Sequence, residues 1–386
     1  MAKWFEKRLD EIAEFNPRES LKKGSIAKKI SMDKLQPFCR DVPGFELEPY
    51  SGGTKFRNGD TIMARITPCL ENGKTAKVSV LENGEVGFGS TEYIVFRAKD
   101  GCDPDFLYYL VTSPIVREPA IKSMVGSSGR QRVQTDVLQK LLVKVPDLEA
   151  QKAISEILKS LDDKINANRK INDNLEQQAK ALYKDWFLDF SPFSSDGTLP
   201  DGWRIGTVGD IIQLHDSKRV PLSGTERSKM AKLYPYYGAT SLMDYVDNYL
   251  FDGIYLLLGE DGTVVDNLGF PILQYVYGRF WVNNHAHIIT GKEGFSVEEL
   301  YLFFGLTNIK SIVTGAVQQK VSQQNLKKVP AIIPSSTALS SFDELIQPIF
   351  SQIRNLRDEN ARLTSLRDIL LPKLMSGELD VSAIEL

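Results

Sequence analysis

The sequence predicts an α+β fold with two globular domains that are related by a pseudo-twofold axis and separated by two long antiparallel coiled-coil helices. Two observations lead to this prediction. The edges of a globular segment occur twice in the chain, and each globular segment is followed by a long run with coiled-coil spacing.

The internal repeat is clearest at the edges of the two globular segments. Trp4, Leu9 and Ile12 reappear with the same spacing as Trp203, Val208 and Ile211. The closing segments Gln131–Pro146 and Gln319–Pro334 are identical at five of sixteen positions. We therefore expect one domain at 1–146 and a second at 203–335, joined to the first helix by a Ser/Gly/Pro-rich linker at 191–202.

The middles of the two domains differ strongly, and both show short alternating runs that indicate strands. The strands are expected at 61–66, 91–98, 253–259 and 286–290, and short helices at 104–113 and 297–305. Asn-Gly turns at 72–73 and 83–84 bracket the run 74–80, which predicts two successive hairpins. Each sheet should be irregular and mostly antiparallel.

The long helices are expected at 147–190 and 340–381. The first run contains neither Gly nor Pro, and apolar residues in both runs recur with alternating three- and four-residue spacing. The expected seam residues are Ile154, Ile157, Leu161, Asn168, Ile171, Leu175 and Leu182, and Ile346, Ile349, Ile353, Leu356, Asn360, Leu363, Leu370 and Leu374.

Some forty residues make a helix of about 60 Å, which is too long for the interior of a small domain. With a pseudo-twofold axis, the second helix must run back along the first, so that the domains are held at opposite ends. Asn168 and Asn360 occupy equivalent seam positions and could fix the register. The alternative is that both asparagines face solvent.

Composition limits the class of protein. The chain has 386 residues, of which 42% are hydrophobic and 25% charged, as in folded water-soluble proteins. No apolar run approaches the roughly 20 residues of a membrane helix, and the N-terminus lacks the apolar middle of a signal peptide, so we expect a cytoplasmic protein. Cys39, Cys69 and Cys102 are far apart and indicate ordinary thiols rather than a zinc site.

Motifs for catalysis are weak. Gly73-Lys74-Thr75 resembles the end of a phosphate loop, but Pro68 stands where the first glycine is needed. His285 and His287 alternate on an expected strand without a third metal ligand nearby in sequence, so we expect no metal.

A loose nuclease pattern occurs twice and supports the alternative of a metal-dependent, single-chain DNA nuclease. The first occurrence is Asp147 with Asp163, and the second is Asp201 with Asp216 and Lys218. Asp147 and Asp163 would lie about 24 Å apart along one helix, which argues against a shared metal.

Two similar but unequal domains on a rigid spacer fit a ligand with repeating geometry, and duplex DNA is such a ligand. Twofold-symmetric readers meet half-sites roughly 34 Å apart, so divergent domains would read two different half-sites with a gap between them. The net charge is −3, but residues 1–146 carry 23 Lys and Arg against 19 Asp and Glu, which leaves room for local basic patches. A coiled-coil adaptor that binds only protein is a further alternative.

Three segments carry a family resemblance: ALYKDWFLDF (181–190), LPDGWR (199–204) and ILLPKLMSGELDV (369–381). They resemble the helical regions of type I restriction-modification specificity subunits, and the QRV and QKV segments resemble the motif that closes each domain of that family. The resemblance covers nearly the whole chain.

This resemblance implies two target recognition domains, a bipartite asymmetric site in double-stranded DNA, and a complex with two methyltransferase subunits and with restriction subunits. It also implies a subunit without catalysis or cofactor of its own. The methyltransferase partner would bind S-adenosylmethionine and methylate adenine N6, and no membrane would be involved.

Candidate DNA contacts are basic or amide side chains in flexible, polar stretches. A matching glutamine, which can pair with adenine or contact the backbone, closes each domain. The candidates are Lys55, Arg57, Arg65, Arg130, Gln131 and Arg132 in the first domain, and Lys218, Arg219, Lys229, Lys232, Gln318, Gln319 and Lys320 in the second. Lys218, Arg219, Lys229 and Lys232 cluster in the variable middle of the second domain.

Overall fold

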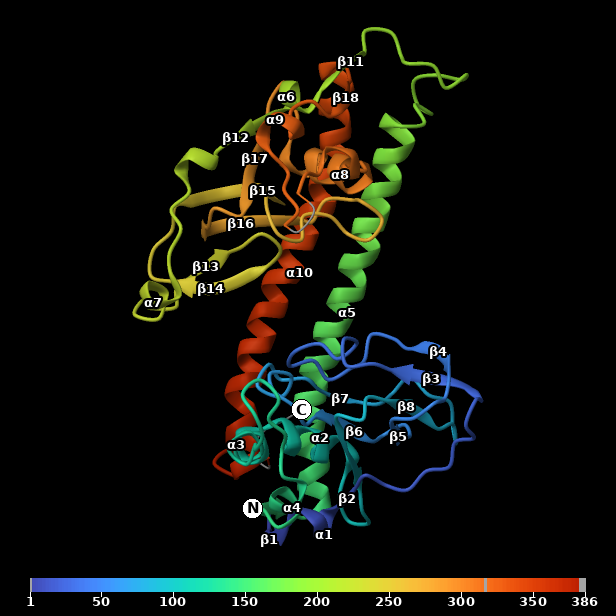
Figure 1. Ribbon diagram of the computed structural model, residues 1–386, viewed down its shortest axis with the longest axis vertical. Helices are drawn as coiled ribbons and strands as arrows, with labels where there is room; N and C mark the ends of the chain where they lie inside the picture. Colours follow the sequence, from blue (N-terminus) through green and yellow to red (C-terminus); the bar gives the residue numbers. More distant parts are fainter. Residues whose placement is uncertain (1, 316–317, 382–386) are drawn as a thin grey trace. The chain divides into compact units, whose positions relative to one another are not determined.

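The computed structural model describes residues 2–315 and 318–381 and separates into two compact units (Figure 1). Unit 1 comprises Met1–Arg169 and Arg357–Leu386, and unit 2 comprises Lys170–Leu356. Each unit therefore contains a globular part and a portion of each of the two long helices, α5 (Leu148–Phe187) and α10 (Ser336–Ser376).

Unit 1 is built on two four-stranded sheets, with orders β2-β9-β6-β7 and β4-β3-β8-β5, and on the two-stranded ribbon β1-β10. Its strands are β1 (Trp4–Arg8), β2 (Ala13–Phe15), β3 (Ile26–Ile30), β4 (Glu46–Pro49), β5 (Thr54–Phe56), β6 (Thr61–Ala64), β7 (Thr75–Lys77), β8 (Gly87–Gly89), β9 (Tyr93–Ala98) and β10 (Leu142–Pro146). Its shorter helices are α1 (Leu9–Ile12), α2 (Pro104–Thr112), α3 (Pro114–Lys122) and α4 (Thr135–Gln139).

Unit 2 has one six-stranded sheet, with order β12-β17-β15-β16-β13-β14, and the ribbon β11-β18. Its strands are β11 (Arg204–Thr207), β12 (Ile212–Leu214), β13 (Tyr234–Tyr237), β14 (Leu242–Val246), β15 (Phe251–Gly259), β16 (Leu273–Val282), β17 (Ala286–Gly291) and β18 (Pro330–Ile333). Its shorter helices are α6 (Val208–Ile211), η1 (Asp216–Lys218), α7 (Gly224–Arg227), α8 (Val297–Leu306), η2 (Lys310–Ile312) and α9 (Gln323–Leu326).

The predicted α+β class and the repeat are confirmed. The order β1-α1-β2 at the start of unit 1 recurs in unit 2 as β11-α6-β12, and the closing strands β10 and β18 pair with β1 and β11. The strand pairs are antiparallel except β3 with β8 and β13 with β16 among the described strands. The two expected short helices are α2 and α8.

One of the two expected hairpins is wrong. β6 and β7 do pair antiparallel. The next strand, β8, pairs with β3 and β5 in the other sheet instead of returning on β7. The Asn83-Gly84 turn therefore carries the chain from one sheet to the other.

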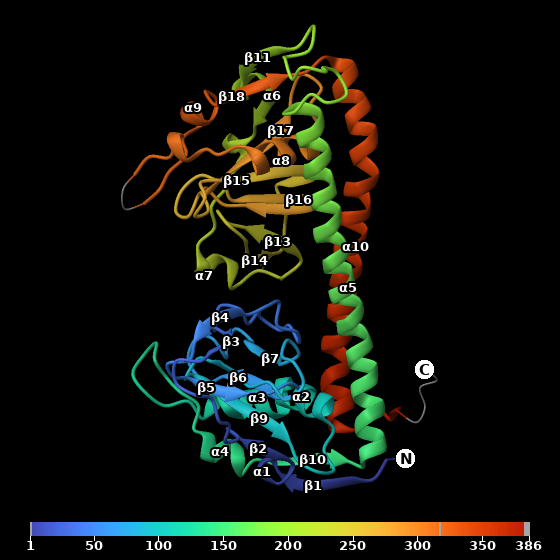
Figure 2. The same ribbon diagram turned by 90° about the vertical axis from the view of Figure 1, so that its right-hand side faces the viewer.

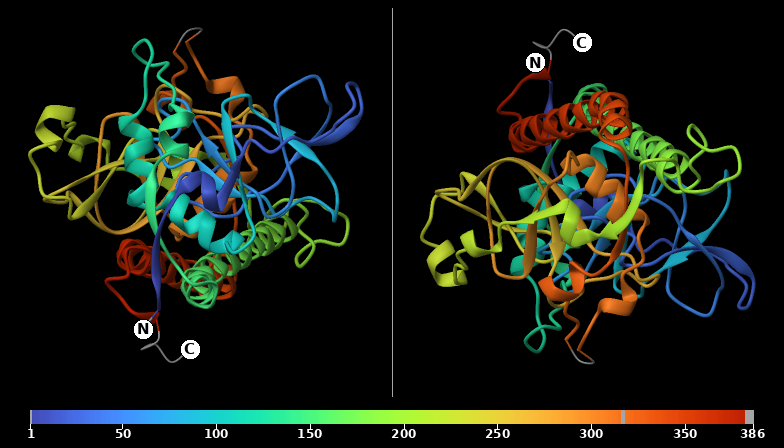
Figure 3. Two further views of the ribbon diagram at one scale, coloured as in Figure 1. Left: turned by 90° about the horizontal axis from the view of Figure 1, so that it is seen from below. Right: turned by 90° about the horizontal axis from the view of Figure 1, so that it is seen from above.

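The long helices run antiparallel within each unit and lie side by side in both views of Figure 3. In unit 1, Asp162 of α5 pairs with Arg367 of α10, and Ile154 shares a core with Leu374. In unit 2, Phe187 packs on Phe342 with ring centroids 4.7 Å apart. In both units many buried apolar residues of the helices belong to the same core as the sheets, so the helices also cover the globular parts.

The helix ends differ from the prediction by a few residues. α5 ends at Phe187, shortly before Phe190, whose φ of 58° is left-handed. α10 begins earlier than expected, at Ser336, where the Ser335 hydroxyl accepts a hydrogen bond from the Ala338 N–H. It ends at Ser376, before Gly377, whose φ of 76° is typical of the residue that follows a helix.

The seam prediction is wrong at Ile171, which is 45% exposed; the neighbouring Asn172 is buried instead. Leu161, Leu175 and Leu182 are half-buried. Asn168 is buried and donates a hydrogen bond to the Asn360 side chain at 2.9 Å, so the solvent-facing alternative is wrong for this pair. The other expected seam residues are buried or half-buried: Ile154, Ile157, Ile346, Ile349, Ile353, Leu356, Leu363, Leu370 and Leu374.

In unit 2, α8 lies between the sheet and α5 (Figure 2). Tyr301 of α8 donates a hydrogen bond to Glu176 of α5 and packs against Phe350 of α10. No helix in the described chain is long and apolar enough to cross a membrane.

Candidate nucleic-acid interface

A narrow loop closes the globular part of unit 1 at residues 125–132. Val125 and Arg132 exchange two backbone hydrogen bonds of 3.0 and 2.8 Å, and the Arg130 N–H donates to the Ser127 carbonyl at the tip. Gly126 and Gly129 have φ angles of 136° and 76°, which residues with a Cβ rarely adopt. The backbone thus presents Arg130 and Gln131 on a defined turn.

Unit 2 repeats this backbone pairing at Thr314 and Lys320. Thr314 and Lys320 exchange backbone hydrogen bonds of 2.9 and 2.7 Å. Residues 316 and 317, which belong to the basic loop expected from sequence, lie outside the described residues. An open polar cleft beside this loop is lined by Asp266, Asn267, Lys310, Gln318 and Gln319, among others.

Both loops are anchored by equivalent backbone bonds. The Gln131 carbonyl accepts from the Thr67 N–H at 3.0 Å, and the Gln319 carbonyl accepts from the Gly262 N–H at 3.0 Å. Two residues further on, the Val133 N–H donates to the Arg65 carbonyl and the Val321 N–H to the Glu260 carbonyl, both at 2.8 Å. Backbone bonds of this kind do not depend on side-chain identity, so each unit can vary its side chains around a common loop.

The cation at the base of each loop is held by a carboxylate. In unit 1, Arg132 makes hydrogen bonds of 2.6 to 3.0 Å with Glu92, and this contact lowers the pKa of the Glu92 carboxyl. In unit 2, Lys320 lies 3.6 Å from Glu260. Both charges are partly compensated within the protein, which weakens them as DNA contacts.

The side chains nearer the loop tips are less engaged with the protein than Arg132 and Lys320. Arg130 and Gln319 are exposed, and Gln131 is half-exposed. Within the part of the chain that the structure describes, none of the three side chains has an intramolecular hydrogen bond or ion pair. These side chains can therefore reach a ligand without breaking an existing contact.

The remaining unit 1 candidates are engaged with acidic or carbonyl partners. Lys55 donates to the Glu19 carbonyl, and Arg57 pairs with the Glu19 carboxylate at 2.7 Å. Arg65 lies 3.9 Å from Glu92. Arg57 is still half-exposed and can reach outward.

Two of the four basic candidates in the variable middle of unit 2 are held at different strands. Arg219 donates to Glu260 at 2.6 Å and to the Ala286 carbonyl of β17, whereas Lys232 binds Asp244 of β14. Four strand spacings separate β17 from β14 in the sheet, which is about 19 Å. Lys218 and Lys229 are exposed and make no ion pair with any described residue.

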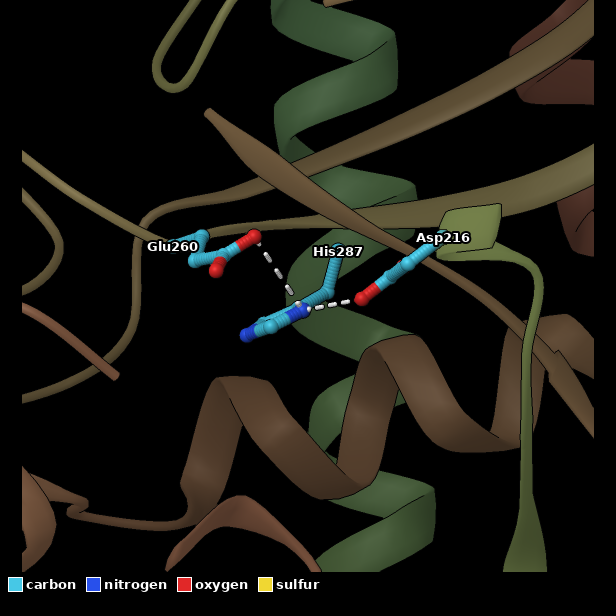
Figure 4. A group of neighbouring side chains, drawn as sticks. All are labelled: Asp216, Glu260 and His287. Carbon is cyan, nitrogen blue, oxygen red and sulfur yellow. Dashed lines mark hydrogen bonds and ion pairs between the residues drawn. The ribbon is translucent and has the colours of Figure 1, made fainter. Parts of the chain in front are cut away.

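A buried polar group underlies the unit 2 loop and is the one candidate for a metal among the described residues (Figure 4). Ligand atoms of Asp216, Glu260 and His287 lie within 4.8 Å of one another. The sequence singled out His285 together with His287, but His285 does not belong to this group. It is partly exposed and pairs with Asp261. The two carboxylates come from η1 and from the end of β15, far from β17 in sequence.

The donor atoms of this group already have partners. Besides His287, Asp216 accepts from the Gln323 amide at 2.6 Å and from the Ile288 N–H at 2.9 Å. Glu260 accepts from Arg219 at 2.6 Å. A cation would have to displace a guanidinium, so the arrangement fits an internal ion-pair network better than a metal site.

The nuclease pattern does not converge. Asp147 caps α5 by accepting from the Ala150 N–H, and Asp163 pairs with Arg40. In the second occurrence, Asp216 is buried against His287. The one cluster of potential metal ligands among the described residues contains Asp216 but none of Asp147, Asp163 and Asp201.

Comparison with known proteins agrees with this organisation. The sequence matches the type I restriction modification DNA specificity domain over residues 1–177 and 200–365. It is 26% identical to the type I restriction enzyme MjaIX specificity subunit of Methanocaldococcus jannaschii, over 74% of this chain and 71% of the relative. It is 24% identical to the HindI specificity subunit of Haemophilus influenzae, over 88% and 89%.

The fold has a solved counterpart. A crystal structure of the type I restriction-modification S subunit from M. genitalium superposes with a TM-score of 0.58 at 15% identity, and the match covers 97% of this chain and 96% of that one. With a specificity domain in each half of the sequence and a repeated loop in each unit, the chain belongs to the family of type I restriction-modification DNA specificity subunits, whose role is sequence recognition and not catalysis.

Proposed function

We propose that unit 1 and unit 2 each read one half of a bipartite, asymmetric site in double-stranded DNA, through the loops 125–132 and 314–320. The observation that carries this proposal is the equivalent backbone anchoring of two loops whose surroundings differ. Arg65 of unit 1 stands where unit 2 has Glu260, and Glu92 stands where unit 2 has His285. The same loop in a different chemical setting is what two unlike half-sites require.

Arg130 is the side chain best suited to a phosphate contact in unit 1. It is exposed, sits at a glycine-containing tip and has no acidic partner among the described residues. Gln131 and Gln319 follow at matched positions, and their amides can donate to phosphate or pair with base edges. Lys218 and Lys229 provide further free charge in unit 2.

Methyl transfer and cleavage belong to partner subunits in this proposal. Two methyltransferase subunits, which bind S-adenosylmethionine, and the restriction subunits would dock on the chain in the cytoplasm, where the host DNA lies. Exposed apolar residues on a helix support a docking role: Leu366 and Ile369 lie three residues apart on α10 and are 45% and 56% exposed. A partner subunit that covers these two residues would remove their apolar surface from water.

The test is selection from a random duplex library by the chain in complex with its methyltransferase subunit. We expect two conserved half-sites with a fixed unread gap. Arg130→Ala should weaken binding about equally for all sequences and reduce the salt dependence by about one phosphate contact. Lys122→Ala is the matched control, because Lys122 already pairs with Glu118.

Two outcomes would contradict the proposal. A single contiguous site would exclude separate reading by two units. An affinity that does not fall with rising salt would favour a protein-only adaptor. Cutting of DNA by the isolated chain with Mg²⁺, abolished by Asp163→Ala, would instead support the nuclease alternative.

A further inference from the structure

The fully buried imidazole of His287 has acceptors on both sides. Its Nε2 lies 2.8 Å from the Val321 carbonyl, and its Nδ1 lies 2.6 Å from the Asp216 carboxylate. A carbonyl oxygen can only accept, so Nε2 carries a proton. Whether Nδ1 also donates depends on the charge of Asp216.

Asp216 is a carboxylate by its contacts. It accepts from the Gln323 amide and the Ile288 N–H, and the Arg219 guanidinium lies 3.7 Å away. Burial alone would raise the pKa of Asp216, but the hydrogen bond from His287 and the nearby positive charge hold it below its ordinary value. The ring of His287 therefore bridges two fixed partners, the Asp216 carboxylate and the Val321 carbonyl.

This ring holds the segment that follows the unit 2 loop. Val321 comes two residues after Gln319, and its carbonyl has His287 as donor while its N–H is bound by Glu260. Gln323, at the start of α9, is tied to the same carboxylate as the ring. His287 and Asp216 thus fix the C-terminal side of the loop to β17 and η1.

The equivalent position in unit 1 has an apolar side chain in place of His287. His287 of β17 pairs with Leu258 of β15, and the equivalent pair in unit 1 is Ile94 of β9 with Met63 of β6. Ile94 and Val133 are buried in one apolar core. The same backbone geometry is therefore closed by apolar packing in unit 1 and by charged hydrogen bonds in unit 2.

We propose that His287 is a positioning residue for the half-site read by unit 2: by holding the Val321 carbonyl, it sets where Gln319 meets DNA. The proposal rests on the DNA-reading function given above. A hydrogen bond constrains both the distance and the angle of the Val321 carbonyl, whereas apolar contact has no directional requirement. Loss of this bond should therefore change discrimination at one half-site rather than overall affinity.

Two substitutions separate the two bonds of the ring. In His287→Gln the amide nitrogen lies near the position of Nε2 and can still donate to Val321. In His287→Asn it lies near Nδ1 and can donate only to Asp216. Each variant therefore keeps one bond of the ring and loses the other.

The measurement is relative affinity for duplexes with single-base changes in each half-site, made with the methyltransferase complex. His287→Asn should lose on the order of tenfold discrimination at one half-site, the same one that Gln319→Ala affects, as expected for one buried hydrogen bond. His287→Gln should stay within about threefold of the parent protein. Gln131→Ala should affect only the other half-site.

Equal losses in the two His287 variants, or losses at both half-sites, would overturn the proposal. If both variants fold poorly, Gln323→Ala decides the matter, because Gln323 is exposed and bonds to the same carboxylate. It should lower discrimination a few-fold at the same half-site, and an unchanged preference would refute the clamp. Failure of the underlying function would look different, since the parent complex would then select no bipartite site.

Discussion

Glu299 should make the stability of unit 2 fall as the pH rises. The residue sits in the first turn of α8 with no exposed surface. One carboxylate oxygen accepts from the Ser296 N–H at 2.7 Å, and the other has no hydrogen-bond partner. Burial, with added repulsion from Asp343 and Glu298, raises the pKa of Glu299 to about 8.

The sign and size of this pH effect on stability follow from the difference between the folded and unfolded pKa of Glu299. In the unfolded chain the carboxyl ionises near 4.5, whereas in the folded chain it keeps its proton up to about 8. Its stabilising contribution is therefore complete below pH 4.5, is lost as the pH rises from 4.5 to 8, and stays lost above. At about 1.4 kcal/mol per pH unit, the loss is on the order of 3–5 kcal/mol.

Glu299→Gln removes this dependence because an amide does not titrate. Its oxygen can still accept from Ser296, and its unpaired N–H group adds a cost that is the same at every pH. The free energy of unfolding of the variant relative to the parent protein should therefore rise from pH 4.5 to 8. Urea unfolding followed by tryptophan fluorescence measures this, since Trp186, Trp203 and Trp281 belong to unit 2.

The adjacent Glu298 provides a matched control of opposite sign. Its carboxylate accepts from the Tyr275 hydroxyl at 2.6 Å and from Arg354 at 3.0 Å. Glu298→Gln should destabilise the protein by roughly 1–3 kcal/mol, because it weakens a buried charge-assisted pair. A stability difference between Glu299→Gln and the parent protein that does not change with pH would refute the reasoning.

Three further changes test the helices. Arg367→Met leaves the buried Asp162 carboxylate without its cation and should lower the free energy of unfolding by about 3–5 kcal/mol, measured by thermal unfolding. Adding Asp162→Leu should recover most of this loss. A loss below about 1 kcal/mol would contradict the burial of the pair. Replacing both Asn168 and Asn360 with Leu should raise the unfolding midpoint and loosen the register, which cross-linking would detect. An unchanged midpoint would count against a stability cost of this polar pair. Seven residues added to both α5 and α10 lengthen each helix by about 10.5 Å. The gap between half-sites should then grow by about 3 base pairs of 3.4 Å with the half-site sequences unchanged, and altered half-sites in the library selection would argue against a spacer role.

The repeat and the long helices could be predicted because both depend on local signals. Trp4 and Trp203 mark the start of each globular part, and the matched Gln131 and Gln319 mark its end. Seam spacing and the absence of Gly and Pro in the first run predicted a helix within three residues of its observed end. These features need no knowledge of which distant residues meet.

The errors concern distant partners. Ile171 fits an apolar seven-residue pattern, but a helix with 3.6 residues per turn drifts from that pattern, and the contact face reaches Asn172 instead. Arg219 is a basic residue in a variable loop, and nothing near it in sequence shows that Glu260, 41 residues away, will bind it. The second predicted hairpin failed because of strand order, since β7 and β8 are consecutive in the chain but belong to different sheets.

The two units show how one scaffold can serve two specificities. Backbone bonds to Thr67 and Gly262 hold the base of each loop in both units, whatever the side chains in the surroundings are. Those surroundings are then free to differ: Ile94 closes unit 1 by packing, and His287 closes unit 2 by hydrogen bonding. Because apolar packing and a charged clamp constrain a loop differently, the two half-sites should differ in strictness as well as in sequence, with sharper discrimination in the half-site that unit 2 reads.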